Sequence, residues 1–135
     1  NVVGFVEKSH LEEIDDIICR IIKKEHLTII KDGKEFDIYF NQIAYIEYSL
    51  RDTTIYLNNN SKIKLSEKSL SLLSKELDDR FYQINRNIII NLDMEPIYNK
   101  GTVKINHNEF QVSRRNQKDL KIKILERSIY NARNI

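Results

Sequence analysis

Three segments of this chain place arginine beside small polar residues at the point where an apolar run ends. Arg51 follows one such run, Arg86 lies next to Asn87 in a second segment, and Arg114 and Arg115 lie together in a third. Arginine presents a planar set of donors that can bind O6 and N7 of guanine together. Asparagine, serine and lysine suit phosphates and base edges. Arginines held by rigid strands could therefore read DNA from loops, without a recognition helix.

Residues with the spacing of a catalytic or metal site are not found elsewhere in the sequence. The three histidines, His10, His26 and His107, lie far apart and have no partner at a metal-ligand spacing. The acidic pairs 15–16 and 78–79 lie on or beside predicted helices, where adjacent side chains point in different directions. There is no Gly-rich phosphate loop and no nucleophile motif. We therefore predict a protein that is not an enzyme and that needs no cofactor or metal.

The charges are distributed unevenly along the chain. Residues 1–79 carry 11 basic and 15 acidic side chains, whereas residues 80–135 carry 11 basic and 5 acidic ones. A basic second half on a nearly neutral protein indicates a localised surface for a polyanion. A solvated charged surface explains the charge balance equally well when the balance is taken alone.

The composition is that of a globular domain with one core. Hydrophobic residues make up 41% and charged residues 31% of the chain. No apolar run reaches the roughly 20 residues of a membrane helix, so no membrane partner is expected. Cys19 is the single cysteine. It cannot form an internal disulfide, which favours a cytoplasmic location.

From about residue 27 the chain is a succession of short β-type runs rich in Ile, Val, Thr, Tyr and Phe. Turn signals such as Asp32-Gly33 separate them. The predicted strands are 27–31, 35–40, 43–48, 53–57, 62–65, 81–85, 88–92, 95–98, 102–106 and 109–112. We expect a mainly β fold of small stacked sheets.

Three helices are expected beside the strands. Ser9 begins an N-terminal helix that runs to about Lys24. Ser66 caps a short central helix with the apolar stripe Leu70, Leu73 and Leu77. A C-terminal helix is predicted over 117–130, with Leu120, Ile124 and Leu125 facing inward.

The three arginine segments, taken in order with the helix before the second, resemble the LytTR DNA-binding domain family. They read IAYIEYSLRD, DRFYQINRNIIIN and FQVSRRNQKDL, and the resemblance covers about residues 27–125. It implies a duplex-DNA-binding domain of a bacterial transcription regulator whose loops enter the major groove. Base-contacting positions fall on Arg51, Arg86 and Arg115. Backbone or auxiliary contacts fall on Asn87, Arg114, Asn116 and Lys118. Asn85 departs from the pattern, because family members often carry histidine there.

The beginning of the chain is similar to the last strand and helix of a response-regulator receiver domain. Val2–Lys8 corresponds to that strand and its lysine, and Ser9 replaces the usual proline. We therefore divide the chain into residues 1–26, the end of a receiver domain or a linker helix, and residues 27–135, the LytTR-like domain. The resemblance implies a two-component regulatory system with an upstream sensor kinase.

Two copies are expected on a repeated DNA site. The predicted N-terminal helix carries an apolar stripe of Leu11, Ile14, Ile18, Ile21 and Ile22. An exposed apolar stripe is unfavourable, so we expect pairing with a second chain.

Roles other than base recognition are open to each arginine, and partners other than duplex DNA are open to the whole domain. Arg51 could be an ordinary loop cation, and Arg86 could pair with Asp79 or Glu95. Arg114 and Arg115 could be the solvated start of a helix.

An RNA-binding β module would need exposed aromatic residues on a sheet. The tyrosines at 39, 45, 48 and 56 lie within apolar runs and are better explained by core packing. A protein-interaction domain with no nucleic-acid partner is the remaining alternative.

Overall fold

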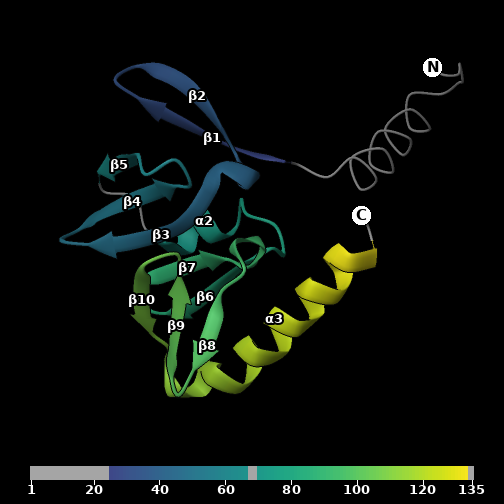
Figure 1. The fold of residues 1–135 in the computed structure, drawn as a ribbon. Coiled ribbons are helices and arrows are strands. Elements are labelled where there is room, and N and C mark those ends of the chain that lie inside the picture. The colour runs from purple at the N-terminus through teal and green to yellow at the C-terminus, as the bar shows by residue number, and fades with distance from the viewer. Residues whose placement is uncertain (1–24, 67–69, 134–135) are drawn as a thin grey trace, which may run out of the picture.

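In the part of the chain that the structure describes, the fold consists of three small antiparallel sheets, one short helix and one long C-terminal helix (Figure 1). The computed structural model describes residues 25–66 and 70–133. The elements are β1 (His26–Lys31), β2 (Lys34–Tyr39), η1 (Phe40–Gln42), β3 (Ile43–Ser49), β4 (Asp52–Leu57), β5 (Lys62–Ser66), α2 (Leu70–Ser74), β6 (Phe81–Asn85), β7 (Ile88–Asn91), η2 (Leu92–Met94), β8 (Ile97–Asn99), β9 (Thr102–Ile105), β10 (Asn108–Gln111) and α3 (Arg114–Arg133).

The largest sheet has five strands in the order β5-β4-β3-β7-β6. β1 and β2 form a separate hairpin, and β10, β9 and β8 form a three-stranded sheet. Every pairing is antiparallel, and most connections are tight hairpins of the kind that the turn signals predict. The predicted mainly β fold of small sheets is confirmed.

The five-stranded sheet has a hydrophobic core on each face. Ile46, Ile55 and Ile89 belong to one cluster, which includes residues of β1, β2 and α2. Tyr45 and Ile90, from neighbouring positions on the same strands, belong to the other cluster, which includes residues of β9 and α3. Side chains alternate along a strand, so a central strand covered on both faces must be apolar throughout. The continuous run 43–46 is buried for this reason.

The C-terminal helix is longer than predicted. α3 begins at Arg114 and not at Gln117, because the Asn116 main-chain N–H already donates to the Ser113 carbonyl at 2.8 Å. Leu120 is fully buried, as expected, but Leu125 is 62% exposed. The assignment of Leu125 to the inner face was wrong, since Arg127 occupies that face further along the helix.

One more local prediction was wrong and several were confirmed. Ser66 ends β5, and residues 67–69 lie outside the described residues, so its capping of the central helix stays a prediction. Tyr39 is 52% exposed, because alternation along β2 buries Ile38 instead. Leu70 and Leu73 of the predicted stripe are buried, and Leu77 packs against the same cluster. The predicted helix over residues 9–24, its apolar stripe and the segment 1–24 lie outside the described residues.

Candidate nucleic-acid interface

The first two arginine segments are joined by a main-chain hydrogen bond. β3 pairs with β7 as far as Glu47 and Ile88. One residue further, the Tyr48 N–H donates to the Asn87 carbonyl at 2.8 Å. The turn that carries Arg86 therefore lies directly beside the end of β3, where the chain turns through Leu50 and Arg51.

The third segment is attached to the second by several hydrogen bonds. The Ser113 N–H donates to the Ile84 carbonyl at 2.9 Å, and the Asn116 side-chain amide donates to the same carbonyl at 3.2 Å. The Asn85 side-chain amide donates to the Gln111 carbonyl at 2.6 Å. The beginning of α3 is thus fixed against the end of β6, and all three predicted segments meet in one region.

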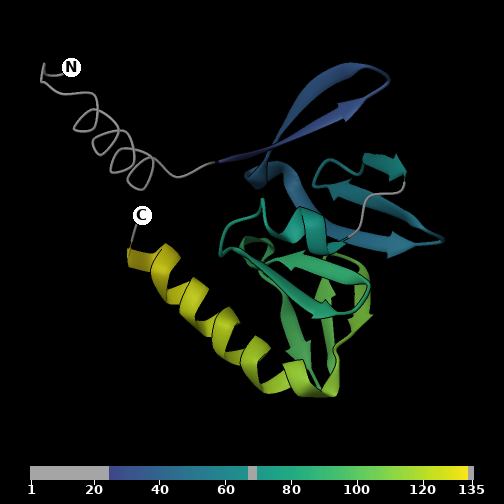
Figure 2. The same ribbon diagram turned by 180° about the vertical axis from the view of Figure 1, so that it is seen from behind.

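The arrangement puts the three loops on one side of the domain. Figures 1 and 2 both place the β3–β4 tip, the β6–β7 turn and the beginning of α3 along the same side, away from the C-terminal end of α3. We call the side formed by residues 49–52, 85–88 and 113–118 the loop face. Its segments lie far apart in the sequence, so only the tertiary fold brings them together.

The predicted cations of the loop face have exposed side chains without a hydrogen-bond or ion-pair partner among the described residues. Within the described part of the chain, no hydrogen bond or ion pair engages the side chains of Arg51, Arg86, Arg114, Arg115 or Lys118, and all five are exposed. Arg86 pairs with neither Asp79 nor Glu95, the alternative that the sequence left open. Asp52, beside Arg51, has its charge compensated by Lys64, whose Nζ lies 3.1 Å from a carboxylate oxygen.

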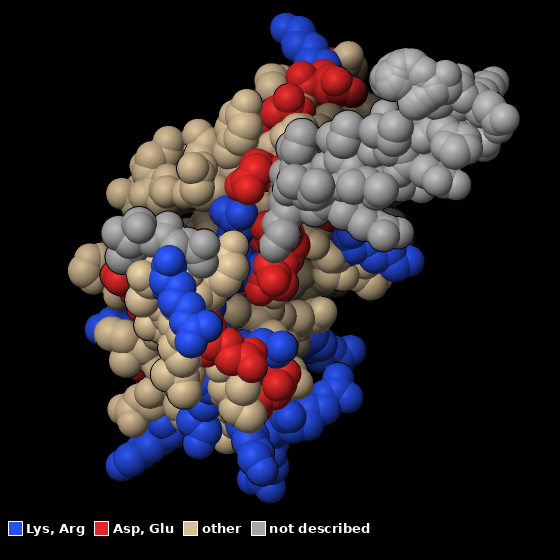
Figure 3. Space-filling model, turned by 90° about the vertical axis from the view of Figure 1, so that its right-hand side faces the viewer, with Lys and Arg blue, Asp and Glu red and all other residues tan. Residues whose placement is uncertain are grey.

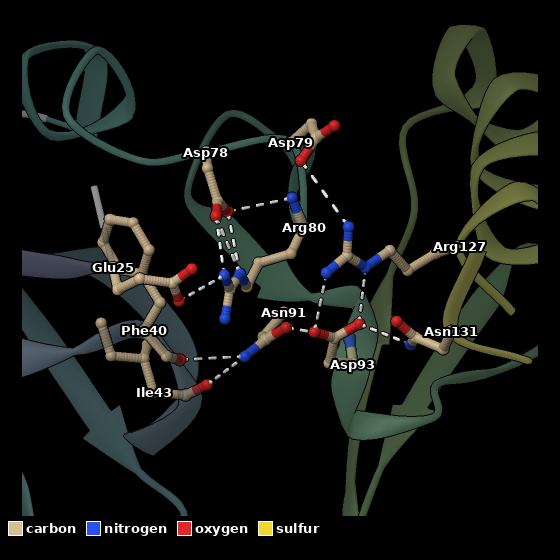
Figure 4. A network of polar contacts seen from close by, with 10 residues as sticks. All are labelled: Glu25, Phe40, Ile43, Asp78, Asp79, Arg80, Asn91, Asp93, Arg127 and Asn131. Atoms are coloured by element: carbon tan, nitrogen blue, oxygen red, sulfur yellow. Dashed lines mark hydrogen bonds and ion pairs between the residues drawn. The ribbon is translucent and has the colours of Figure 1, made fainter. Parts of the chain in front are cut away.

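Two further arginines, at the far ends of the same elements, are fully engaged (Figure 4). Arg80 precedes β6 and binds Asp78 and Glu25 through hydrogen bonds of 2.9–3.0 Å. Its guanidinium also lies over the Phe40 ring, 5.4 Å from the ring centre. Burial would lower the pKa of Arg80, but the bonds with Asp78 and Glu25 outweigh it and raise the pKa. This cation has a structural role.

Arg127 is the central residue of the second half of that network. Its Nε donates to Asp93 at 2.7 Å, and Asn131 donates to the same carboxylate at 2.9 Å. Asp79 lies 3.7 Å from another nitrogen of Arg127. Burial would raise the pKa of Asp93, but the hydrogen bonds from Arg127 and Asn131 lower it. The network ties the second half of α3 to the end of β7.

Two asparagines of the second segment have structural roles that the sequence did not reveal. Asn91 is 1% exposed; its amide donates to the carbonyls of Phe40 and Ile43, and its oxygen accepts from the Asp93 N–H. Asn85 holds the turn around Arg86, since its oxygen accepts from the Asn87 N–H at 2.7 Å. An asparagine followed two positions later by a main-chain donor is a common turn element, and that signal could have identified Asn85.

Asn116 and Asn87, predicted as auxiliary contacts, differ in their surroundings. The Asn116 amide is occupied by the Ile84 carbonyl, although the side chain remains partly exposed. The Asn87 side chain is exposed, and only its main chain is engaged by Asn85 and Tyr48.

Another contact holds α3 against the sheet near the loop face. The Tyr82 hydroxyl donates to Asp119 at 3.0 Å. Burial and the Asp119 carboxylate raise the pKa of Tyr82 to about 12. The hydroxyl therefore stays a proton donor near neutral pH and keeps Asp119 occupied, away from the cations of the loop face.

The side of the molecule on which α3 lies in Figure 1 has mixed charge. Figure 3 shows acidic side chains along the middle of that side and Lys and Arg gathered at its lower end, where α3 begins in Figure 1. The described residues contain no group of His, Cys, Asp and Glu side chains that could hold a metal ion. Among them there is also no helix long and apolar enough to cross a membrane.

A family model described as the LytTr DNA-binding domain matches residues 33–125. The chain belongs to the LytTR DNA-binding domain family. A solved structure described as the LytTr DNA-binding domain of a methyl-accepting/DNA response regulator from Bacillus cereus is similar in fold, with a TM-score of 0.59 and 16% identity. The match covers 76% of this chain and 98% of that one. No curated protein sequence gives a significant match.

Membership of the LytTR family confirms the resemblance found in the sequence for the β domain. The matched range contains the complete loop face and ends within α3. It begins inside the β1–β2 hairpin, so residues 1–26 are outside it. LytTR is a family of DNA-binding domains, and this LytTR domain therefore has duplex DNA as its expected ligand.

Proposed function

We propose that this domain binds duplex DNA in a sequence-specific way, with Arg51, Arg86 and Arg115 contacting bases in the major groove. Arg114, Asn87, Asn116 and Lys118 then supply phosphate and auxiliary contacts. The observation that carries the proposal is the contrast between the arginines of the loop face and two arginines outside it, Arg80 and Arg127. Those of the loop face have no partner among the described residues, whereas Arg80 and Arg127 each bind two carboxylates.

The physical reason lies in the cost of holding cations together without counterions. Uncompensated arginines on adjacent loops repel one another, and DNA phosphates relieve that repulsion when the arginines displace condensed counterions from the DNA. Short hydrogen bonds between the loops keep the arginines at fixed separations. Fixed donors with free hydrogen-bonding capacity are what base reading requires.

The beginning of α3 supports the same surface. The first N–H groups of a helix carry partial positive charge and suit a phosphate oxygen. Arg114 and Arg115 occupy the first turn of this 20-residue helix, and Lys118 lies one turn further. A phosphate near this end of the helix would meet both the helix dipole and these side chains.

An RNA-binding module is less well supported. Single-stranded RNA is bound by stacking bases on exposed aromatic rings. Tyr45 and Tyr56 stack on each other with ring centres 4.5 Å apart, and Tyr45 is buried. The exposed aromatic residues Phe36, Tyr39 and Tyr130 lie outside the loop face.

The proposal extends to the intact regulator through the similarity of residues 1–26 to a receiver domain. We infer that two copies occupy a repeated site as a dimer and that a sensor kinase controls the regulator. Sedimentation of the chain with duplexes containing one or two sites would measure the stoichiometry directly. One chain bound to the two-site duplex at saturation would contradict this extension.

Selection of bound sites from random duplex DNA tests the central proposal. We expect a defined sequence to be enriched and its binding to weaken steeply as salt concentration rises. Competition with single-stranded RNA of matched length provides the discriminating measurement. Enrichment of no duplex sequence, or preferential displacement by RNA, would contradict the proposal.

A further inference from the structure

Leu50, at the tip of the β3–β4 hairpin, is the most exposed of the large hydrophobic side chains on the described part of the chain. It is 93% exposed, ahead of Ile30 at 73%. The last strand pair before the tip is Ser49 with Asp52, so Leu50 and Arg51 alone form the turn. Leu50 therefore projects from the loop face beside a cation with no described partner.

The backbone at this tip is unfavourable for both residues. Leu50 and Arg51 have φ values of 54° and 69°, in the left-handed region. Hairpin turns with two left-handed residues favour Asn-Gly or Asp-Gly, because a side chain with Cβ is strained there. Leucine also lacks the short polar group that makes this conformation tolerable in asparagine.

The same chain provides an internal comparison. Two more two-residue hairpin turns have positive φ at both positions, Asp32-Gly33 and Lys100-Gly101. Each has glycine at the second position, where the third turn has Arg51. The chain thus has glycine at the second position of these two hairpins but not at the tip on the loop face. Neither turn geometry nor core packing explains Leu50.

We propose that Leu50 is a specificity-determining residue that contacts the 5-methyl group of a thymine beside the base read by Arg51. This inference rests on the proposed DNA-binding function. The thymine methyl is the apolar feature of the major groove, and proteins recognise it by apolar contact. A leucine carried on the same rigid turn as an arginine places an apolar group and a donor fork side by side. Strain retained at such a position is typical of a functional site.

The test combines a substitution in the protein with one in the DNA. In the selected site, each thymine is replaced in turn by deoxyuridine, which lacks only the methyl group. We expect one replacement to weaken binding of the unmodified chain about fourfold, the value for one buried methyl group. Leu50→Asn should weaken binding to the thymine site by a similar factor and should bind both sites equally.

Leu50→Asn also separates a functional role from a structural one. Asparagine suits the left-handed turn, so the variant should have a higher melting temperature than the unmodified chain while binding less tightly. If the variant lost affinity because it unfolds, both its melting temperature and its affinity would be lower than those of the unmodified chain. The matched control is Ile30→Thr on β1, another exposed apolar residue outside the loop face, which should leave binding to both sites unchanged.

The outcomes distinguish this inference from the function on which it rests. If a site is selected and Arg86→Ala weakens binding, but Leu50→Asn keeps the full deoxyuridine effect, then only the role of Leu50 is overturned. A selected site in which no thymine methyl matters overturns it as well. If no duplex sequence is selected, the proposed function fails and this inference fails with it.

Discussion

The Asn85 side-chain amide donates to the Gln111 main-chain carbonyl at 2.6 Å, while the oxygen of the same amide accepts from the Asn87 N–H at 2.7 Å. One side chain thus shapes the turn around Arg86 and attaches that turn to the end of β10. This chain therefore uses the asparagine to connect its loops.

Asn85→Ala should reduce both stability and specific binding, because it frees the Arg86 turn from the third segment. Loss of two partly exposed hydrogen bonds should cost about 1–2 kcal/mol of unfolding free energy. Asn85→Asp keeps the acceptor for Asn87, loses the donor to Gln111 and adds a negative charge, so its loss of affinity on the selected site is compared with its loss on random duplex DNA. Urea denaturation and DNA titration measure the two effects. Unchanged specific affinity in Asn85→Asp would show that the connection does not position Arg86.

Arg86→Ala and Arg115→Ala should each cost about 1–3 kcal/mol of binding to the selected site and relax the preference at particular base pairs. Both side chains are exposed and have no partner among the described residues, so folding should be unaffected. Titrations against the selected site and against random duplex DNA give the result. Equal losses on the two duplexes would reassign these arginines to phosphate contacts.

Lys118→Ala should weaken binding to all duplexes alike and reduce the slope of log K against log salt by about one unit. Lys118 is exposed one turn into α3, where a phosphate is expected. The measurement is a series of titrations between low and physiological salt. Lys104→Ala, an exposed lysine on β9 outside the loop face, serves as control, and identical slopes for both variants would remove Lys118 from the interface.

Arg80→Met should destabilise the fold strongly and leave the DNA contacts intact in the folded fraction. The methionine can still pack on Phe40, but Asp78, largely buried, loses its counterion, which should cost about 3 kcal/mol. Glu25→Gln is the milder companion, since the Glu25 side chain is 61% exposed and its ion pair should contribute about 1 kcal/mol or less. Chemical denaturation compares them. Equal effects would show that the Arg80–Asp78 pair is not the stabilising part of the network.

Stability should fall in acid through Asp93. Its pKa is lower in the folded protein than in the unfolded chain, so on acidification the unfolded state binds the proton first. The contribution of this carboxylate is complete above about pH 4 and is lost as the pH falls below that value through the lower folded pKa. Asp93→Asn should therefore be less stable than the unmodified chain at neutral pH, with a difference that shrinks in acid. A difference independent of pH would contradict the role of its charge.

The strands, the class of fold and the three arginine segments could all be predicted from local patterns of residues. Alternation over a few residues fixes which side of a strand is apolar, and turn residues act on their own backbone, so both signals are local. The boundaries of all strands but the eighth were predicted to within one residue for this reason. The eighth begins two residues later than predicted, because Glu95 has a left-handed backbone, with a φ of 54°. The start of α3 was missed although Ser113, a residue type common at helix N-caps, directly precedes Arg114.

Which arginines are available to a ligand depends on contacts between segments that lie far apart in the sequence. Arg80 and Arg86 lie at opposite ends of β6 and look alike in sequence, yet Arg80 binds Glu25 from 55 positions away, while Arg86 has no described partner. Contacts over such separations depend on how the sheets stack, and nothing in the neighbouring residues encodes them. The exposure of Leu50 and the left-handed backbone of its turn are likewise not encoded by the neighbouring residues. They follow from the pairing of β3 with β4 and β7, which carries the hairpin tip beyond the core and into solvent.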